Sequence, residues 1–137
     1  MTTHFCDTSA FYALSMPSDR DHEAAKGLWR RILASGCSLM TTNYVLTETI
    51  ALIQGRHGLR AVLQFLGHID VVVDVSFLDS ALHASALARL LTTSRRAVSF
   101  VDCTSFEFMR SRALETAFAF DEHFEEQGFV VLRAGQI

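Results

Sequence analysis

Short apolar segments alternate with amphipathic segments along the whole chain. The clearest apolar segment is VVVDV at residues 71–75, which is mostly β-branched and typical of a buried strand. The predicted strands are residues 4–6, 37–40, 71–75, 116–120 and 129–132. The predicted helices are residues 8–15, 19–35, 43–54, 57–68, 76–91 and 99–113, with a short turn or helix up to residue 127. Short apolar strands divided by helices predict an α/β fold, with a parallel sheet covered on both faces.

Glycines and capping residues mark the expected helix ends. Gly36 follows the second helix, and Gly55 and Gly67 are predicted to end the next two. Ser76 with Asp79 has the spacing of a capping box, in which each residue bonds the backbone N–H of the other, and predicts a helix start at residue 76.

The bulk composition is that of one domain with its own core. The chain has 137 residues, half of them hydrophobic, and only one proline. The longest uncharged run, residues 32–47, is shorter than the roughly 20 apolar residues of a membrane helix. No basic segment precedes an apolar one at the N-terminus, so neither a signal peptide nor a membrane span is expected. Three widely spaced cysteines favour a reduced, cytoplasmic chain.

The charge balance excludes a strongly basic surface over the whole molecule. The formal net charge is −3, from 12 basic and 15 acidic residues. Every basic residue except Lys26 is an arginine, whose planar guanidinium suits phosphates and carboxylates. The arginines form local pairs at 30 with 31, 56 with 60, 95 with 96, and 110 with 112. Each pair is either a phosphate contact or a solvated helix face.

Four acids stand where function is expected in such a sheet. Asp7 and Asp121 follow predicted strands, and ligands of open α/β sheets bind outside the carboxyl ends of the strands. Glu48 lies on an otherwise apolar helix face, and Asp102 lies three residues after Ser99. Each acid also has a local explanation: helix caps for Asp7, Asp102 and Asp121, and solvent exposure or an ion pair with Arg56 for Glu48.

A shared metal site is the competing explanation. Hard divalent ions such as Mg²⁺ prefer oxygen ligands, and crowded carboxylates need a cation to stay ionised. Such ions can activate water and stabilise the leaving oxygen during phosphodiester cleavage. The four acids are far apart in the sequence, so only the fold can gather them.

The segments DTSAFYAL, TTNYVLTETIAL, SFVDCTSFEFMR and FAFDEHFEEQGFVVL carry these acids in order. Together they resemble the four acidic motifs of the PIN-domain family over essentially the whole chain. Within that family they resemble most closely the VapC-type ribonuclease toxins of bacterial toxin–antitoxin pairs. The resemblance implies a single PIN-like domain over residues 1–137, built as a three-layer α/β/α sandwich. It also implies RNA cleavage that depends on Mg²⁺ or Mn²⁺.

The resemblance also implies residue roles. Asp7, Glu48, Asp102 and Asp121 would be the catalytic, metal-binding acids, with Thr8 and Ser9 supporting them. His123 is close to Asp121 in sequence, but a surface position is expected for it. Setting the four acids aside leaves 12 basic against 11 acidic residues, so arginine pairs could contact RNA. Phenylalanines at 106 and 108, with Glu107, depart from the small and aliphatic packing usual in the family.

The partners implied by the resemblance are RNA, a small antitoxin protein and a second copy of the chain in a homodimer. The apolar helices around residues 44–53 and 59–66 are candidates for the antitoxin groove and the dimer face, and they can equally be core. Two rival functions stay open. A phosphoacceptor signalling domain needs a lysine at a late strand end, where this chain has none. A catalytically silent PIN-fold module would bind RNA or protein without cleaving it.

Overall fold

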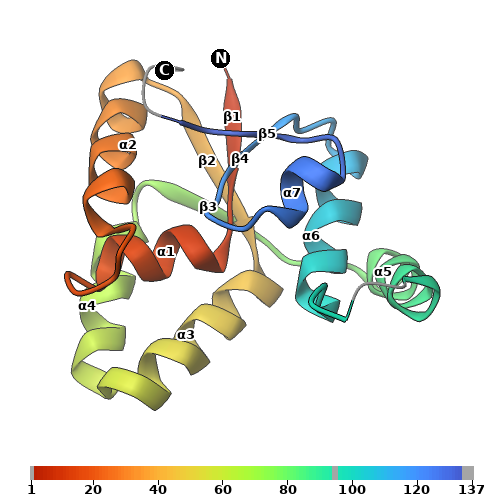
Figure 1. The fold of residues 1–137 in the computed structure, drawn as a ribbon, viewed down its shortest axis with the longest axis horizontal. Coiled ribbons are helices and arrows are strands. Elements are labelled where there is room, and N and C mark those ends of the chain that lie inside the picture. The colour runs from red at the N-terminus through yellow and green to blue at the C-terminus, as the bar shows by residue number, and fades with distance from the viewer. Residues whose placement is uncertain (1, 94–95, 134–137) are drawn as a thin grey trace.

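A computed structural model describes residues 2–93 and 96–133 (Figure 1). Its centre is a parallel five-stranded sheet with the strand order β3-β2-β1-β4-β5. The strands are β1 (Thr3–Cys6), β2 (Ser38–Thr42), β3 (Val73–Ser76), β4 (Thr116–Phe118) and β5 (Val130–Val131). The chain adds β2 and β3 on one side of β1 and then returns to add β4 and β5 on the other side. The direction in which successive strands are added therefore reverses between β1 and β4. Binding sites of open α/β sheets form at such a position.

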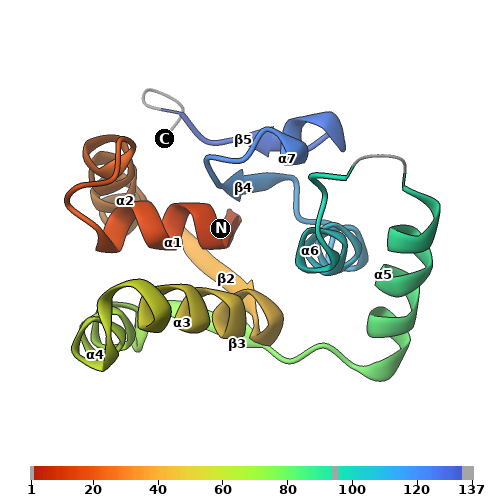
Figure 2. The same ribbon diagram turned by 60° about the horizontal axis from the view of Figure 1, so that its bottom comes forward.

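Helices cover both faces of this sheet, as expected for three layers. They are α1 (Thr8–Ser15), α2 (His22–Ser35), α3 (Asn43–His57), α4 (Leu59–Ile69), α5 (Ser80–Thr92), α6 (Phe100–Ser111) and α7 (His123–Glu126). Figure 2 shows α1, α2 and α4 on one side of the sheet and α6 on the other, with α5 packed outside α6. Among the described residues, no helix combines the length and the apolar character needed to cross a bilayer.

Phenylalanine rings fill the layer between the sheet and α6. Phe5 on β1 contacts Phe108 and Phe124 at centroid distances of 5.9 and 6.2 Å. Phe106 packs edge-to-face on Phe124 at 5.1 Å and stacks on Phe129 at 6.1 Å. Helix α6 therefore packs on the core through Phe106 and Phe108, the two rings that were predicted to alter its packing. Cys6 and Cys103 are free thiols buried in the same core, as their apolar sequence context indicates.

Several predicted boundaries are wrong, and each error has a local cause. The chain stays extended through Ser76, which pairs with Thr42, and α5 begins only at Ser80. Asp79 is the N-cap residue of α5 and accepts from Leu82 N–H at 2.9 Å, so the proposed Ser76–Asp79 capping box does not form. Similarly, β2 extends to Thr42 because Thr41 and Thr42 are β-branched and fully buried.

Glycine positions explain the other differences. Gly55 lies inside α3, which ends instead at Gly58, where a φ of +88° separates α3 from α4. Gly67 likewise lies inside α4. Gly36 ends α2 with a φ of +76°, as predicted, because only glycine adopts this backbone conformation at little cost.

The phenylalanine core generates a stability prediction. Replacing Phe106 with alanine is expected to lower the free energy of unfolding by about 3–5 kcal/mol, because the ring is fully buried against two others. Urea unfolding followed by circular dichroism measures the change. Phe77→Ala is the control: this ring is 78% exposed, so a change within about 0.5 kcal/mol is expected. Equal losses in the two variants would contradict the assigned core.

Candidate active site

Asp7 lies directly after β1, at the centre of the sheet's carboxyl edge. Its backbone is extended (φ −100°, ψ 161°), and its side chain caps α1 by accepting from Ser9 N–H at 3.1 Å. The Ser9 hydroxyl donates to the same carboxylate oxygen at 2.7 Å and accepts from Phe120 N–H at 2.9 Å. Ser9 therefore fixes the Asp7 carboxylate and ties it to the chain that leaves β4.

Asp102 enters the same region from the first turn of α6. It forms a capping box with Ser99: Asp102 Oδ2 accepts from Ser99 N–H at 3.0 Å, and Ser99 Oγ accepts from Asp102 N–H at 3.0 Å. The residue is 8% exposed. Among the described residues, no donor reaches its second carboxylate oxygen, Oδ1. The cap thus orients the carboxylate and leaves one oxygen free.

Asp121 and Glu48 complete the group from two further elements. Asp121 follows β4, and its Oδ1 accepts from His123 N–H at 2.8 Å in the turn that opens α7. Glu48 is half-buried on α3, and its carboxylate has no hydrogen bond or ion pair with any described residue. Arg56, its proposed partner, instead lies over the Tyr12 ring and donates to the Tyr12 hydroxyl at 3.4 Å. The proposed Glu48–Arg56 ion pair is therefore absent.

Electrostatic coupling shows that the fold gathers the four acids. The pKa of Asp7 is raised to about 7, mainly by burial; the charges of Asp102 and Asp121 contribute to the rise, and the Ser9 hydrogen bonds oppose it. Burial also raises the pKa of Asp102, as do Asp121 and Glu48, while the Ser99 N–H and His123 oppose the shift. Among the described residues, none of the four acids pairs with an arginine or lysine. Within the described part of the chain they form an anionic cluster whose one basic neighbour is His123, at 3.7 Å from Asp121.

The donor set fits a hard divalent cation. One ligand atom each from Asp102, Asp121 and His123 lies within 4.8 Å of the other two. Ionised carboxylates buried without a counter-charge are unfavourable by several kcal/mol, so they protonate or bind a cation. Carboxylate oxygens are the ligands that Mg²⁺ and Mn²⁺ prefer. Asp7, Glu48, Asp102 and Asp121 would supply those oxygens.

The expected surface position of His123 is wrong. The residue is only 7% exposed; its Nδ1 contacts Glu126 Oε1 at 2.8 Å and its Nε2 lies 3.7 Å from Asp121 Oδ1. The hydrogen bond to Glu126 is the main reason that the pKa of His123 is raised, with Asp121 and Asp102 adding to the effect. Its spacing of two residues from Asp121 was the available sequence signal, since an aspartate at a turn bonds the backbone two residues on.

Thr8 and Ser9 have different surroundings. Ser9 contacts the Asp7 carboxylate directly, as its expected supporting position requires. Thr8 instead faces α3: its hydroxyl donates to Val45 C=O at 3.4 Å and accepts from the Thr49 hydroxyl at 3.0 Å. Thr8 therefore joins α1 to the helix that carries Glu48, and its hydroxyl bonds no carboxylate of the cluster among the described residues.

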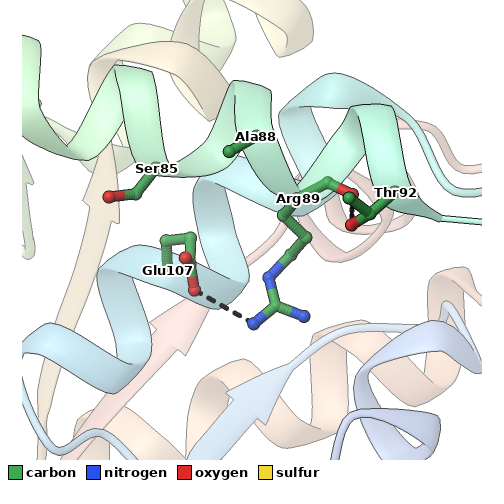
Figure 3. A pocket seen from close by; sticks show the side chains of 5 residues that line it. All are labelled: Ser85, Ala88, Arg89, Thr92 and Glu107. Atoms are coloured by element: carbon green, nitrogen blue, oxygen red, sulfur yellow. Dashed lines mark hydrogen bonds and ion pairs between the residues drawn. The ribbon is translucent and has the colours of Figure 1, made fainter.

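A separate hollow of about 460 Å³ lies between α5 and α6 (Figure 3). Arg89 pairs there with Glu107 at 3.3 Å and donates to Gln127 Oε1 at 3.3 Å. Arg110 also contacts Glu107, at 3.7 Å, and donates to Gln127 Oε1 at 3.0 Å. These contacts join α5, α6 and α7, so Glu107 and its arginines hold helices together. The hollow contains none of the four acids.

Comparison with known proteins agrees with this architecture. The family model described as "PIN domain" matches residues 4–130, and the chain belongs to the PIN-domain family. It is 38% identical over 130 residues to the 23S rRNA-specific endonuclease VapC20 of Mycobacterium tuberculosis, covering 94% of this chain and 97% of that protein.

Solved structures give the same result. The crystal structure of M. tuberculosis VapC20, a sarcin–ricin loop cleaving toxin, superposes with a TM-score of 0.84 at 36% identity, covering 96% of this chain and 99% of that one. VapBC2 from Rickettsia felis, bound to a promoter DNA fragment, superposes with a TM-score of 0.71 at 8% identity over 96% of this chain and 98% of that one, which shows a shared fold. The predicted fold class and family resemblance are both confirmed.

The buried position of Asp7 generates a pH prediction for the metal-free protein. Its pKa is about 7 in the folded state against 3.8 ordinarily, so the folded protein binds a proton between these values that the unfolded chain has lost. The stabilisation that this bound proton provides is fully present below the ordinary pKa of the carboxyl. It is lost as the pH rises through the pKa of the folded state. In EDTA, the free energy of unfolding relative to Asp7→Asn should therefore fall by up to about 4 kcal/mol as the pH rises from about 4 to above 7.

Urea unfolding at a series of pH values measures this difference. Asparagine still caps a helix, so Asp7→Asn removes the titration and keeps the local structure. The control is Asp74→Asn, which removes a carboxylate from an exposed position of β3. A pH-independent difference for Asp7→Asn would contradict the buried, uncompensated carboxyl.

Proposed function

We propose that this protein is a divalent-metal-dependent endoribonuclease and the toxin of a type II toxin–antitoxin pair. The observation that carries the proposal is the convergence of Asp7, Glu48, Asp102 and Asp121 at one sheet edge, with no arginine or lysine paired to them among the described residues. Its 38% identity to a 23S rRNA-specific endonuclease over nearly the full length supports ribosomal RNA as the substrate. We assign Mg²⁺ or Mn²⁺ as the cofactor.

The chain's own residues would orient the ligands. Ser9 holds Asp7, the Ser99 N–H holds Asp102, and the turn at His123 holds Asp121, so each carboxylate is fixed before an ion binds. A divalent ion bound there supplies Lewis acidity, which lowers the pKa of water and stabilises negative charge on the phosphodiester. His123 is placed to orient Asp121 and to exchange a proton with Glu126.

The rival functions differ from this proposal in specific features. The only lysine, Lys26, lies on α2 and faces Glu23 at 3.8 Å, far in sequence from any late strand end, which disfavours a phosphoacceptor domain. A silent binding module would retain the fold without needing four uncompensated acids, which reduce stability when no ion is bound. The acids therefore favour catalysis.

The catalytic proposal predicts a severe loss of cleavage in Asp7→Asn and in Asp102→Asn. Each change removes a carboxylate that we assign to the metal, so cleavage of ribosomal RNA should fall by at least about 100-fold. EDTA should abolish wild-type cleavage, and Mg²⁺ or Mn²⁺ should restore it. Gel assays of cleaved RNA and growth after induced expression provide the measurements.

Asp79→Asn is the matched control, because Asp79 also caps a helix but lies outside the acid cluster. It should cleave at the wild-type rate and inhibit growth equally. Wild-type cleavage by both Asp7→Asn and Asp102→Asn would eliminate the metal-site proposal, whereas RNA binding without cleavage by the wild type would favour the silent module.

The proposed partners are a small antitoxin protein and a second copy of this chain. Of the two candidate helices, α3 turns Val45, Thr49 and Ile53 into the core, while α4 buries Val62, Phe65 and Ile69 and exposes two leucines. Leu59 and Leu63 are 64% and 62% exposed and lie one helical turn apart. This exposed α4 face is the candidate dimer surface, and the neighbouring reading frame is the place to seek the antitoxin.

The dimer proposal predicts that Leu63→Glu produces a monomer. A charge placed in an apolar interface is unfavourable, whereas on an exposed helix face it should change stability by no more than about 0.5 kcal/mol. Analytical ultracentrifugation over a range of concentrations distinguishes a monomer from a dimer. The control is Leu87→Glu on α5, another exposed leucine. A wild-type monomer at high concentration, or an unchanged dimer in Leu63→Glu, would rule out this face.

A further inference from the structure

A groove of about 350 Å³ runs beside Glu48, between α3 and the first turn of α6. Figures 1 and 2 both show the N-terminal ends of these two helices side by side. The lining residues are Asn43, Tyr44, Thr47, Glu48, Ala51 and Val101. Its surface combines one aromatic ring, aliphatic side chains and a few polar atoms, and its volume is in the range of small-ligand sites.

The groove is continuous with the acid cluster. Tyr44, Glu48 and Ala51 are spaced four and three residues apart, so they share one face of α3. Val101 on the opposite wall directly precedes Asp102 in α6. A group bound in the groove would therefore lie between helices that carry two of the four acids, next to the position we assign to the phosphodiester.

Tyr44 is held rigidly in this groove. Its hydroxyl is hydrogen-bonded to His83 Nδ1 of α5, and its ring packs edge-to-face on Phe100 at 6.0 Å. The His83 and Phe100 rings pack on each other at 5.2 Å. Three rings from three helices thus fix the orientation of Tyr44 in advance, which reduces the entropy lost when a ligand stacks on it.

We propose that this groove binds one unstacked nucleobase of the RNA substrate, stacked on Tyr44 and adjacent to the phosphodiester that is cut. The proposal rests on the endoribonuclease function proposed above. Proteins read single-stranded RNA by stacking splayed bases on aromatic side chains and bonding their edges. Such stacking is favourable for every base, since each has a flat aromatic face.

Polar atoms at the rim favour a base over an apolar protein side chain. Asn43 Oδ1 already accepts from Leu78 N–H at 2.9 Å, so its amide NH₂ is left to donate. The Thr47 hydroxyl donates to Asn43 C=O at 2.7 Å, so its oxygen is left to accept. An aliphatic occupant would leave this donor and acceptor without partners, whereas the edge of a base carries both.

Cleavage kinetics test the role of the Tyr44 ring. The substrates are 23S rRNA and a synthetic hairpin with the sarcin–ricin loop sequence, the target of the relative. Tyr44→Ala should lower kcat/KM by about 5- to 150-fold, the range of one base–aromatic stack. Tyr44→Phe keeps the ring and should retain most of the activity. Mn²⁺ binding, followed by calorimetry, should be unchanged in both variants, because within the described chain the Tyr44 hydroxyl bonds His83 and no acid of the cluster.

Tyr12→Ala is the matched control. Tyr12 is the other tyrosine of the chain, also half-buried and also bonded to a histidine, at 3.0 Å from His57 Nε2. It lies on α1, five residues beyond Asp7, and its loss should leave cleavage of the hairpin unchanged. Equal losses in Tyr44→Ala and Tyr12→Ala would indicate a general effect on the fold and overturn the proposal.

Abasic RNA gives the decisive comparison. Hairpins lacking the base at one position on either side of the mapped cut are cleaved by the wild type and by Tyr44→Ala. If Tyr44 stacks on a base, removing that base should slow the wild type and cause no further loss in Tyr44→Ala, because both changes delete the same contact. Losses that multiply at every position would overturn the proposal.

Two further readouts separate this inference from the proposed catalysis. Binding of the intact hairpin to Asp7→Asn, with and without Tyr44→Ala, is followed by fluorescence anisotropy. A Tyr44-dependent affinity together with a wild type that does not cleave would refute the nuclease and retain the base site. Unchanged cleavage in Tyr44→Ala, with altered sedimentation, would assign the groove to a second copy of the chain and refute the base site.

Discussion

The unfavourable burial of carboxylates at the centre of the sheet is the constraint on which this structure depends. Asp7 follows the central strand, and Asp121 follows its neighbour β4, at the point where the strand order changes direction. Burial and mutual repulsion raise the pKa of both Asp7 and Asp102. In the metal-free protein, these buried carboxylates therefore reduce the stability of the fold. The phenylalanine core below the cluster, from Phe5 to Phe106, Phe108 and Phe124, provides the compensating apolar burial.

Local capping and a shared site are compatible explanations of the same acids. Asp7, Asp102 and Asp121 each accept a backbone N–H at the start of a helix or turn, as their local sequence predicts. A cap uses one carboxylate oxygen and fixes the orientation of the other, as Asp102 illustrates. The capping bonds therefore orient three carboxylates toward the acid cluster. Glu48 joins the same cluster from the middle of a helix.

The sequence predicts the alternation of strands and helices better than it predicts the exact element boundaries. Alternation of apolar strands with helices was sufficient for the parallel sheet, and the strand-end pattern indicated two of the four acids, Asp7 and Asp121. The start of α5 was missed because Ser76 and Asp79 have capping-box spacing, while pairing of Ser76 with Thr42 keeps the chain extended. His123 was misplaced because its burial depends on packing of α7 against the sheet, which no local pattern reports. The Glu48 environment also needed the fold, since Arg56 lies two turns away and bonds Tyr12 instead.

The elements that hold the acids also shape the surface that a substrate meets. Glu48 reaches the cluster only if α3 and α6 approach through their first turns, and that approach creates the groove beside Tyr44. The ring contacts of Tyr44 with His83 and Phe100 then bring α5 into contact with both helices, although α5 otherwise packs outside α6. Substitutions on the groove face of α3 can therefore change which RNA is accepted while the caps that aim the carboxylates stay intact. Under the proposed function, the capping bonds would orient the metal ligands and the groove side chains would select the RNA, so RNA selection could vary while the metal site is kept.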